Sequence, residues 1–160
     1  MQKIVTNLWF DGRVEEALEL YTSCFEDARV TSVTRFSEGG MGTPGDVMTA
    51  EFELAGQKFC IINGGPVYTF SPAMSLAVNC VDQDEVNRLW ERLTSNGGEE
   101  GQCGWLTDRF GVSWQIVPTA LAEMLSSDDA AAVERVTAAF LKMTKLDIGE
   151  LDKAFRNEHD

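Results

Sequence analysis

The first part of the chain alternates between the spacing typical of strands and that of helices. Apolar residues run together over 4–10 and end at an Asp-Gly turn signal, which predicts a strand. From residue 14 to 25 they recur at steps of three and four, as on one stripe of a helix. Alternating β-branched residues over 30–36 predict a second strand, and 47–54 with 57–62 predict a hairpin. Together these elements form a βαβββ module.

The same order of elements returns after residue 70. Residues 75–81 predict a strand, and the acidic residues 82–85 predict the first turn of a helix, where the helix dipole favours negative charge. Short strands are predicted at 102–107 and 112–117, on either side of a turn at 108–111. The repeat is one of element order, with little identity of residues, and it predicts a second, shorter βαβββ module.

Beyond Pro118 the pattern is helical. It predicts a short helix at 121–125, a helix capped by Asp128 and Asp129, and a last amphipathic segment near 151–155. The predicted fold class is therefore α+β, with two βαβββ modules at about 1–70 and 71–120 forming a curved mixed sheet. A helical C-terminal extension, 121–160, belongs to the same domain. Its apolar stripes need burial, either on the outer face of the sheet or on a second subunit.

Charge and composition restrict the partners and the location of the protein. The formal net charge of −13 excludes binding to a nucleic-acid backbone, which needs clustered Lys and Arg. No apolar run approaches the roughly 20 residues that cross a bilayer, and the first residues lack the apolar core of a secretion signal. We therefore expect a cytoplasmic protein with neither nucleic acid nor membrane as a partner. The four cysteines include no CxxC pair, which favours reduced thiols.

Six segments carry a resemblance to a known family: LWFDG at 8–12, EEA at 15–17, NGGP at 63–66, SL at 75–76, DQDEV at 82–86 and QCGWLTDRFGVSWQIVP at 102–118. They resemble PhnB-like proteins of the glyoxalase/bleomycin resistance/dioxygenase (vicinal oxygen chelate) superfamily, which have been labelled demethylubiquinone 3-methyltransferase-like. The resemblance runs from about residue 3 to 155. It implies the vicinal oxygen chelate fold, in which paired βαβββ modules curl into an open cup that holds the ligand, commonly in a homodimer.

The resemblance also implies where a metal ion would bind. Metal-dependent members of the superfamily take His and Glu ligands from the strands that line the cup. Here those positions fall near Ile4 or Asn7, near Ile62 or Asn63, at about Ser75, and at Gln115. None is a histidine or a carboxylate, and the single histidine, His159, lies in the tail. Neutral amides and hydroxyls bind such metals poorly, so we predict a metal-free cup without a cofactor.

The predicted ligand-binding residues combine flat aromatic surfaces with neutral polar groups. They are Asn7, Trp9, Asn63, Ser75, Cys103, Trp105, Trp114 and Gln115. Five of them have a structural alternative: core packing for the three tryptophans, a hydrogen bond to neighbouring backbone for the Gln115 amide, and a packed thiol for Cys103. Asp108 and Arg109 are read as turn residues, although a charge pair near the cup mouth is the alternative. No catalytic residue is assigned.

The leading functional hypothesis is a homodimeric protein that binds an unknown small molecule, with no reaction assigned. Sequestration of a toxic compound is a special case of it. The alternative is an enzyme of the superfamily, either a metal-dependent lyase or dioxygenase, or a methyltransferase as the family label says. Missing metal ligands argue against the first kind of enzyme. Against the second, no strand is followed by the glycine-rich turn and acidic residue of a Rossmann-type adenosylmethionine site.

Overall fold

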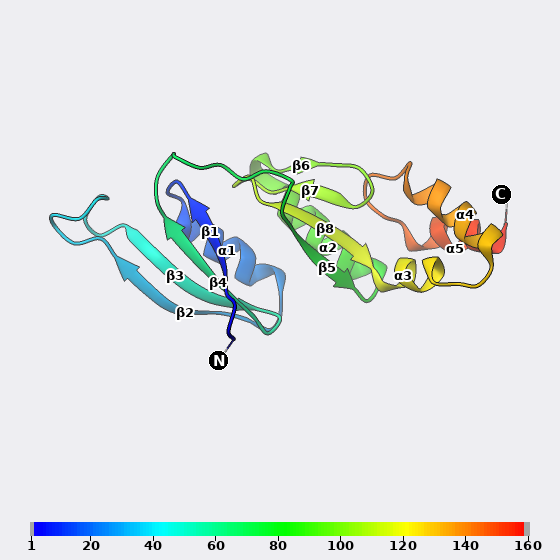
Figure 1. Cartoon of the computed structure of the whole chain (residues 1–160), viewed down its shortest axis with the longest axis horizontal. Coiled ribbons are helices and arrows are strands. Elements are labelled where there is room, and N and C mark those ends of the chain that lie inside the picture. The colour runs from blue at the N-terminus through cyan, green and yellow to red at the C-terminus, as the bar shows by residue number, and fades with distance from the viewer. Residues whose placement is uncertain (1, 159–160) are drawn as a thin grey trace. The chain divides into compact units, whose positions relative to one another are not determined.

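The computed structural model of the chain describes residues 2–158, and it divides into two compact units, Met1–Phe70 and Ser71–Asp160. Figure 1 labels the elements of both units. Each unit carries its own four-stranded mixed sheet, so the predicted α+β class is confirmed. The grouping of both modules and the extension into one domain stays a prediction. Among the described residues, no helix has the length and apolar character needed to span a membrane.

The first unit has the predicted βαβββ order. Its elements are β1 Thr6–Phe10, α1 Val14–Cys24, β2 Ala28–Arg35, β3 Val47–Leu54 and β4 Gln57–Asn63. The sheet order is β1-β4-β3-β2, in which β1 and β4 run parallel and the other pairs antiparallel. The first strand begins two residues later than predicted, and Ile4, which the apolar run included, is 82% exposed.

The core of the first unit lies between α1 and one face of its sheet. The helix buries a stripe of apolar residues, among them Ala17, Leu18 and Tyr21. The Tyr21 ring stacks on Phe52 of β3 at 6.2 Å between centroids, and Phe52 stacks on Phe59 of β4 at 5.3 Å. Because side chains alternate along a strand, their neighbours in sequence project from the opposite face, which α1 does not cover.

The second unit repeats this order and adds three helices. Its module consists of β5 Ser75–Cys80, α2 Gln83–Thr94, a single 3₁₀ turn, β6 Glu99–Glu100, β7 Trp105–Thr107 and β8 Ser113–Pro118. The sheet order is β5-β8-β7-β6, with β5 and β8 parallel. Asp82 caps α2 by accepting a hydrogen bond from the Glu85 N–H at 2.8 Å, which agrees with the acidic start predicted there.

The strand predicted at 102–107 is wrong in its first half. Cys103 and Gly104 have positive φ angles of 59° and 82°, which turn the chain instead of extending it. Their N–H groups do not join the sheet but donate to the carbonyls of Met143 and Thr144, both at 2.8 Å. The strand therefore starts at Trp105, and the short strand before it, Glu99–Glu100, was not predicted.

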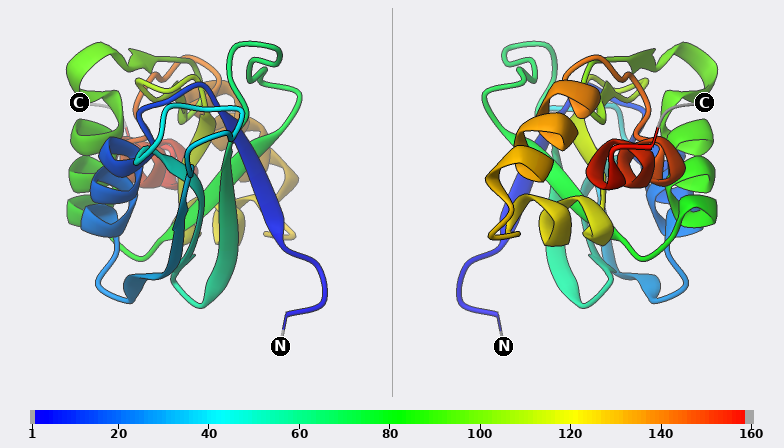
Figure 2. Two further views of the ribbon diagram at one scale, coloured as in Figure 1. Left: turned by 90° about the vertical axis from the view of Figure 1, so that its left-hand side faces the viewer. Right: turned by 90° about the vertical axis from the view of Figure 1, so that its right-hand side faces the viewer.

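The C-terminal extension consists of α3 Thr119–Leu125, α4 Ala130–Phe140 and α5 Ile148–Arg156, which Figure 2 shows side by side. Its core contains Leu121, Val136, Leu146 and Leu151. The extension is fastened to the module of its own unit, because the Gln83 side chain donates to the Leu146 carbonyl at 3.1 Å and accepts from the Ile148 N–H at 2.8 Å. The extension therefore contacts its own module, while packing against a second subunit stays a prediction.

Candidate functional site

Strand alternation separates the predicted site residues in the first unit. Leu8 and Phe10 are each 4% exposed and face α1, which places Asn7 and Trp9 on the opposite face of the sheet. In register, Trp9 pairs with Ile62 of β4, and Ile62 pairs with Thr49 of β3. A row of side chains with Trp9 at one end therefore crosses the face turned away from α1.

Trp9 is held in a defined orientation. Its indole N–H donates to the Gly65 carbonyl at 2.9 Å, and its ring meets the Tyr68 ring edge-on, with centroids 5.0 Å apart. The six-membered ring lies so close to Gly64 that a Cβ at this position would overlap it. The NGGP segment that closes the hairpin is thus also the support of the Trp9 side chain.

Tyr68 is not among the ligand-binding residues predicted from the sequence. The Tyr68 side chain is 64% exposed, and it lies in the irregular segment that follows the NGGP turn. No periodic pattern marks such a segment, so its aromatic residues gave no signal beyond their composition. The structure pairs Tyr68 with Trp9 and makes a two-ring aromatic surface on the first unit.

The two asparagines of the first unit differ in how their amides are used. The Asn63 amide accepts from the Gly12 N–H and donates to the Val47 carbonyl, both at 2.9 Å. It therefore fixes the turn that leads into α1, and its polar atoms are engaged by the fold. The Asn7 amide donates to the Val5 carbonyl at 3.0 Å and is exposed.

In the second unit, Gln115 and Ser75 are brought together. Gln115 Nε2 donates to Ser75 Oγ at 2.9 Å, so the amide is bound to a side chain rather than to neighbouring backbone. Gln115 also pairs in register with Ala77 of β5 and with Trp105 of β7. Trp105, Gln115 and Ser75 thus share the face of the sheet turned away from α2.

Trp114 and Asp108 lie in the interior of the second unit. Each is 2% exposed, and the Trp114 indole N–H donates to Asp108 Oδ2 at 2.9 Å. Asp108 Oδ1 accepts from the Phe110 and Val112 N–H groups at 2.9 and 3.0 Å. The structure therefore gives Asp108 the turn role expected of it, and it places Trp114 in the core-packing environment that was its alternative.

The cysteines show no arrangement for nucleophilic chemistry. None of the four forms a disulfide among residues 2–158, and Cys103 Sγ lies 3.7 Å from the Leu141 carbonyl oxygen, against the C-terminal extension. Burial raises the pKa of the Cys80 thiol to about 12, with a further contribution from the negative charge of Glu85. Burial also raises the pKa of Cys60, which Glu51 reinforces. Both thiols stay protonated at neutral pH, which makes them poor nucleophiles.

Metal-ligand grouping and cavities both bear on the chemistry of the site, and one cavity of about 160 Å³ in the first unit has Asn63 in its lining. Among residues 2–158, no three or more His, Cys, Asp or Glu side chains are grouped so as to hold a metal ion. His159 lies outside the described residues. A pocket of about 350 Å³ opens in the first unit beside Glu51, Lys58 and Phe59. It lies toward the opposite end of β4 from Trp9, and none of the predicted ligand-binding residues lines it.

Solved structures define the class of fold. The chain is similar to protein PA1353 from Pseudomonas aeruginosa, with 22% identity, a TM-score of 0.60, and coverage of 74% of this chain and 98% of that one. It is also similar to the fosfomycin resistance protein FosX from Listeria monocytogenes, with 16% identity, a TM-score of 0.59, and coverage of 79% and 98%. With its paired βαβββ modules, the chain has the vicinal oxygen chelate fold.

Two further similarities define the protein family, which is a smaller group than the proteins that share the fold. A family model described as 3-demethylubiquinone-9 3-methyltransferase matches residues 2–117, and the PhnB protein from Bacillus cereus is 38% identical. That similarity has a TM-score of 0.69 and covers 73% of this chain and 99% of the Bacillus cereus chain. The chain belongs to this PhnB-like family. No curated protein matches it.

Proposed function

We propose that each unit holds a small molecule on the sheet face turned away from its own helix, α1 in the first unit and α2 in the second, without a metal ion and in a cytoplasmic homodimer. One observation carries the proposal. In both units that face presents a tryptophan next to neutral hydrogen-bonding groups, Trp9 with Tyr68 in the first and Trp105 with Gln115 in the second. Apolar surface with a few placed polar groups is how proteins usually hold small molecules.

The aromatic surface of the first unit favours a ligand that carries a flat, apolar group. Trp9 and Tyr68 meet at an interplanar angle of 76°, which leaves ring faces and edges available for a planar group. The hydrogen bond from the Trp9 indole to Gly65 fixes the ring before a ligand arrives. A surface held in this way loses little conformational entropy on binding, which supports affinity.

The polar pair of the second unit favours a ligand that carries a group able both to donate and to accept a hydrogen bond. When Gln115 Nε2 donates to Ser75 Oγ, the Ser75 hydroxyl proton and the Gln115 carbonyl oxygen stay available. A hydroxyl on the ligand satisfies both atoms, because it donates to the Gln115 carbonyl oxygen and accepts from the Ser75 hydroxyl. Asn63 and Trp114 are left out of this proposal because their polar atoms serve the turn into α1 and the Asp108 carboxylate.

The second candidate function is enzymatic, and it rests on the name of the family model, 3-demethylubiquinone-9 3-methyltransferase. The Mn(II) bound in one FosX structure adds the metal-dependent version of this candidate. Against the metal-dependent version, Ser75 and Gln115 stand near the expected ligand positions, and both are neutral.

Metal content separates metal-free binding from the metal-dependent version of the enzyme. We expect purified, untagged protein to contain no stoichiometric metal by mass spectrometry, because neutral amides and hydroxyls bind transition metals weakly. Its melting temperature is likewise expected to stay unchanged on addition of Ni²⁺, Zn²⁺, Mn²⁺ or Fe²⁺. A bound metal in a one-to-one ratio, or a clear rise in melting temperature at low metal concentration, would favour the metal-dependent enzyme.

A further inference from the structure

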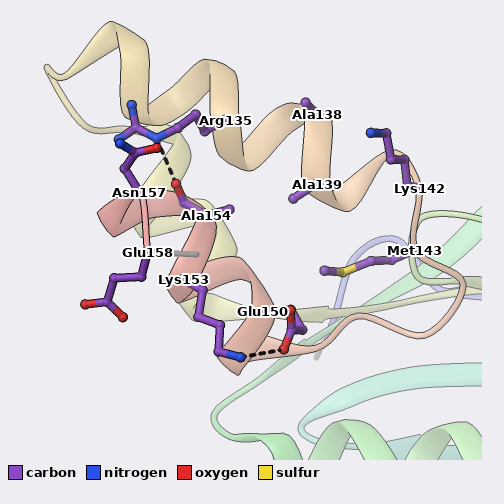
Figure 3. A pocket seen from close by; sticks show the side chains of 10 residues that line it. All are labelled: Arg135, Ala138, Ala139, Lys142, Met143, Glu150, Lys153, Ala154, Asn157 and Glu158. Atoms are coloured by element: carbon purple, nitrogen blue, oxygen red, sulfur yellow. Dashed lines mark hydrogen bonds and ion pairs between the residues drawn. The ribbon is translucent and has the colours of Figure 1, made fainter. Parts of the chain in front are cut away.

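A groove between α4 and α5 has the features of a second binding site. It has a volume of about 590 Å³, within the range of small-molecule sites. Its lining combines the apolar side chains of Ala138, Met143 and Ala154 with the basic side chains of Arg135, Lys142 and Lys153. Figure 3 shows Arg135 near one end of this helical groove and Lys142 near the other.

The basic residues of the helical groove are not equivalent. Arg135 is engaged by the fold, because its guanidinium donates to the carbonyls of Ala154 and Phe155 at 2.9 and 2.7 Å. Lys153 pairs with Glu150 at 3.3 Å. Lys142 is exposed and makes no ion pair within residues 2–158. An unpaired ammonium group beside apolar surface is a recognition point for an anion.

We propose that the helical groove binds a small amphipathic anion with an apolar body and a single negative charge. The body lies on Ala138, Ala154 and Met143, and the charged group faces Lys142. A single charge fits best because Glu150 and Glu158 line the same groove and repel a polyanion. The net charge of −13 also repels a polyanion, over longer distances.

The helical groove is separate from the family's own features. The family model matches only up to residue 117, and the Bacillus cereus PhnB protein is 99% covered while 27% of this chain (100% − 73%) stays unmatched. The groove belongs to α4 and α5, which begin at Ala130 and Ile148. Anion binding in the helical groove therefore does not depend on ligand binding at the sheet faces, and each can be tested without the other.

Titration of the full chain with sodium decanoate, followed by NMR of the nitrogen-labelled protein, tests the proposal. We expect backbone signals of Ala138, Lys142 and Ala154 to shift. Lys142→Ala is expected to weaken binding by about three- to tenfold, because it removes the charged partner. Lys145→Ala, a change at an exposed lysine outside the groove lining, should leave the affinity unchanged.

A filling variant tests the apolar half of the helical groove. Ala138 is exposed, so Ala138→Trp is compatible with folding, and its indole should occupy the groove and abolish decanoate binding. Ala131→Trp, at an exposed position of the same helix outside the lining, should bind like the unaltered protein. Decanoate shifts that are absent, or that survive Ala138→Trp, would overturn the proposal. Tighter binding of inorganic phosphate than of decanoate would also overturn it.

Discussion

Replacing Asp108 by alanine is expected to lower the free energy of unfolding by about 3 kcal/mol. The Asp108 carboxylate is buried and accepts hydrogen bonds from the Phe110 N–H, the Val112 N–H and the Trp114 indole. Alanine leaves these donors without an acceptor in the interior, where water does not replace the lost bonds. Urea denaturation monitored by circular dichroism measures the loss.

The matched control for Asp108 is Asp11→Ala. Asp11 is an exposed aspartate with no side-chain hydrogen bond recorded among residues 2–158, so its removal should change the free energy of unfolding by less than about 0.5 kcal/mol. Equal unfolding midpoints for the two variants would show that the Asp108 carboxylate does not organise the turn and Trp114.

Leu146→Ala is expected to destabilise the protein by about 2–4 kcal/mol. Leu146 is 0% exposed, belongs to the core of the extension, and lies against Gly104, where an added Cβ would stand 2.9 Å from Leu146 Cδ1. Truncation opens a cavity at the place where the extension meets its module. Because the two parts are joined there, the loss should appear in one unfolding transition rather than in a separate early one.

Leu141→Ala is the control for this position. Leu141 lies in the same extension but is 57% exposed, so its truncation should have little effect on the unfolding midpoint. Two results would show that the extension folds independently of its module. One is equal stability of Leu146→Ala and Leu141→Ala, and the other is an early unfolding transition of Leu146→Ala that is confined to the helices of the extension.

The spacing of apolar residues predicted a helix or strand wherever that element buries only one of its faces. The helix stripe from Val14 to Cys24 and the stripe of α2 were both read from spacing, because a helix packed on a sheet must bury one face. The strand predicted at 102–107 is wrong in its first half, because the N–H groups of Cys103 and Gly104 donate to the carbonyls of residues 143 and 144. These acceptors lie some 40 positions later in the chain. Contacts at such separation leave no trace in local spacing.

The candidate site was predicted less well, for a reason that lies in strand geometry. Residues next to each other in a strand face opposite sides, so Trp114 and Gln115 do not share an environment although both looked suitable. The residue types of the motif at 102–118 did not decide whether the side chain of Trp114 or that of Gln115 points toward α2. The partner of Gln115, Ser75, lies 40 positions earlier and was on the predicted list only because of the family resemblance.

The most direct test of the central claim is a small-molecule screen that uses NMR of the nitrogen-labelled protein to map each hit. We expect hits that shift the indole signal of Trp9, or the Trp105 indole signal with the Gln115 side-chain amide, and that bind more weakly to Trp9→Ala or Trp105→Ala. These shifts should persist when metals are removed with a chelator. Hits that leave all three side chains unperturbed, or that require an added metal ion, would contradict metal-free binding at the sheet faces.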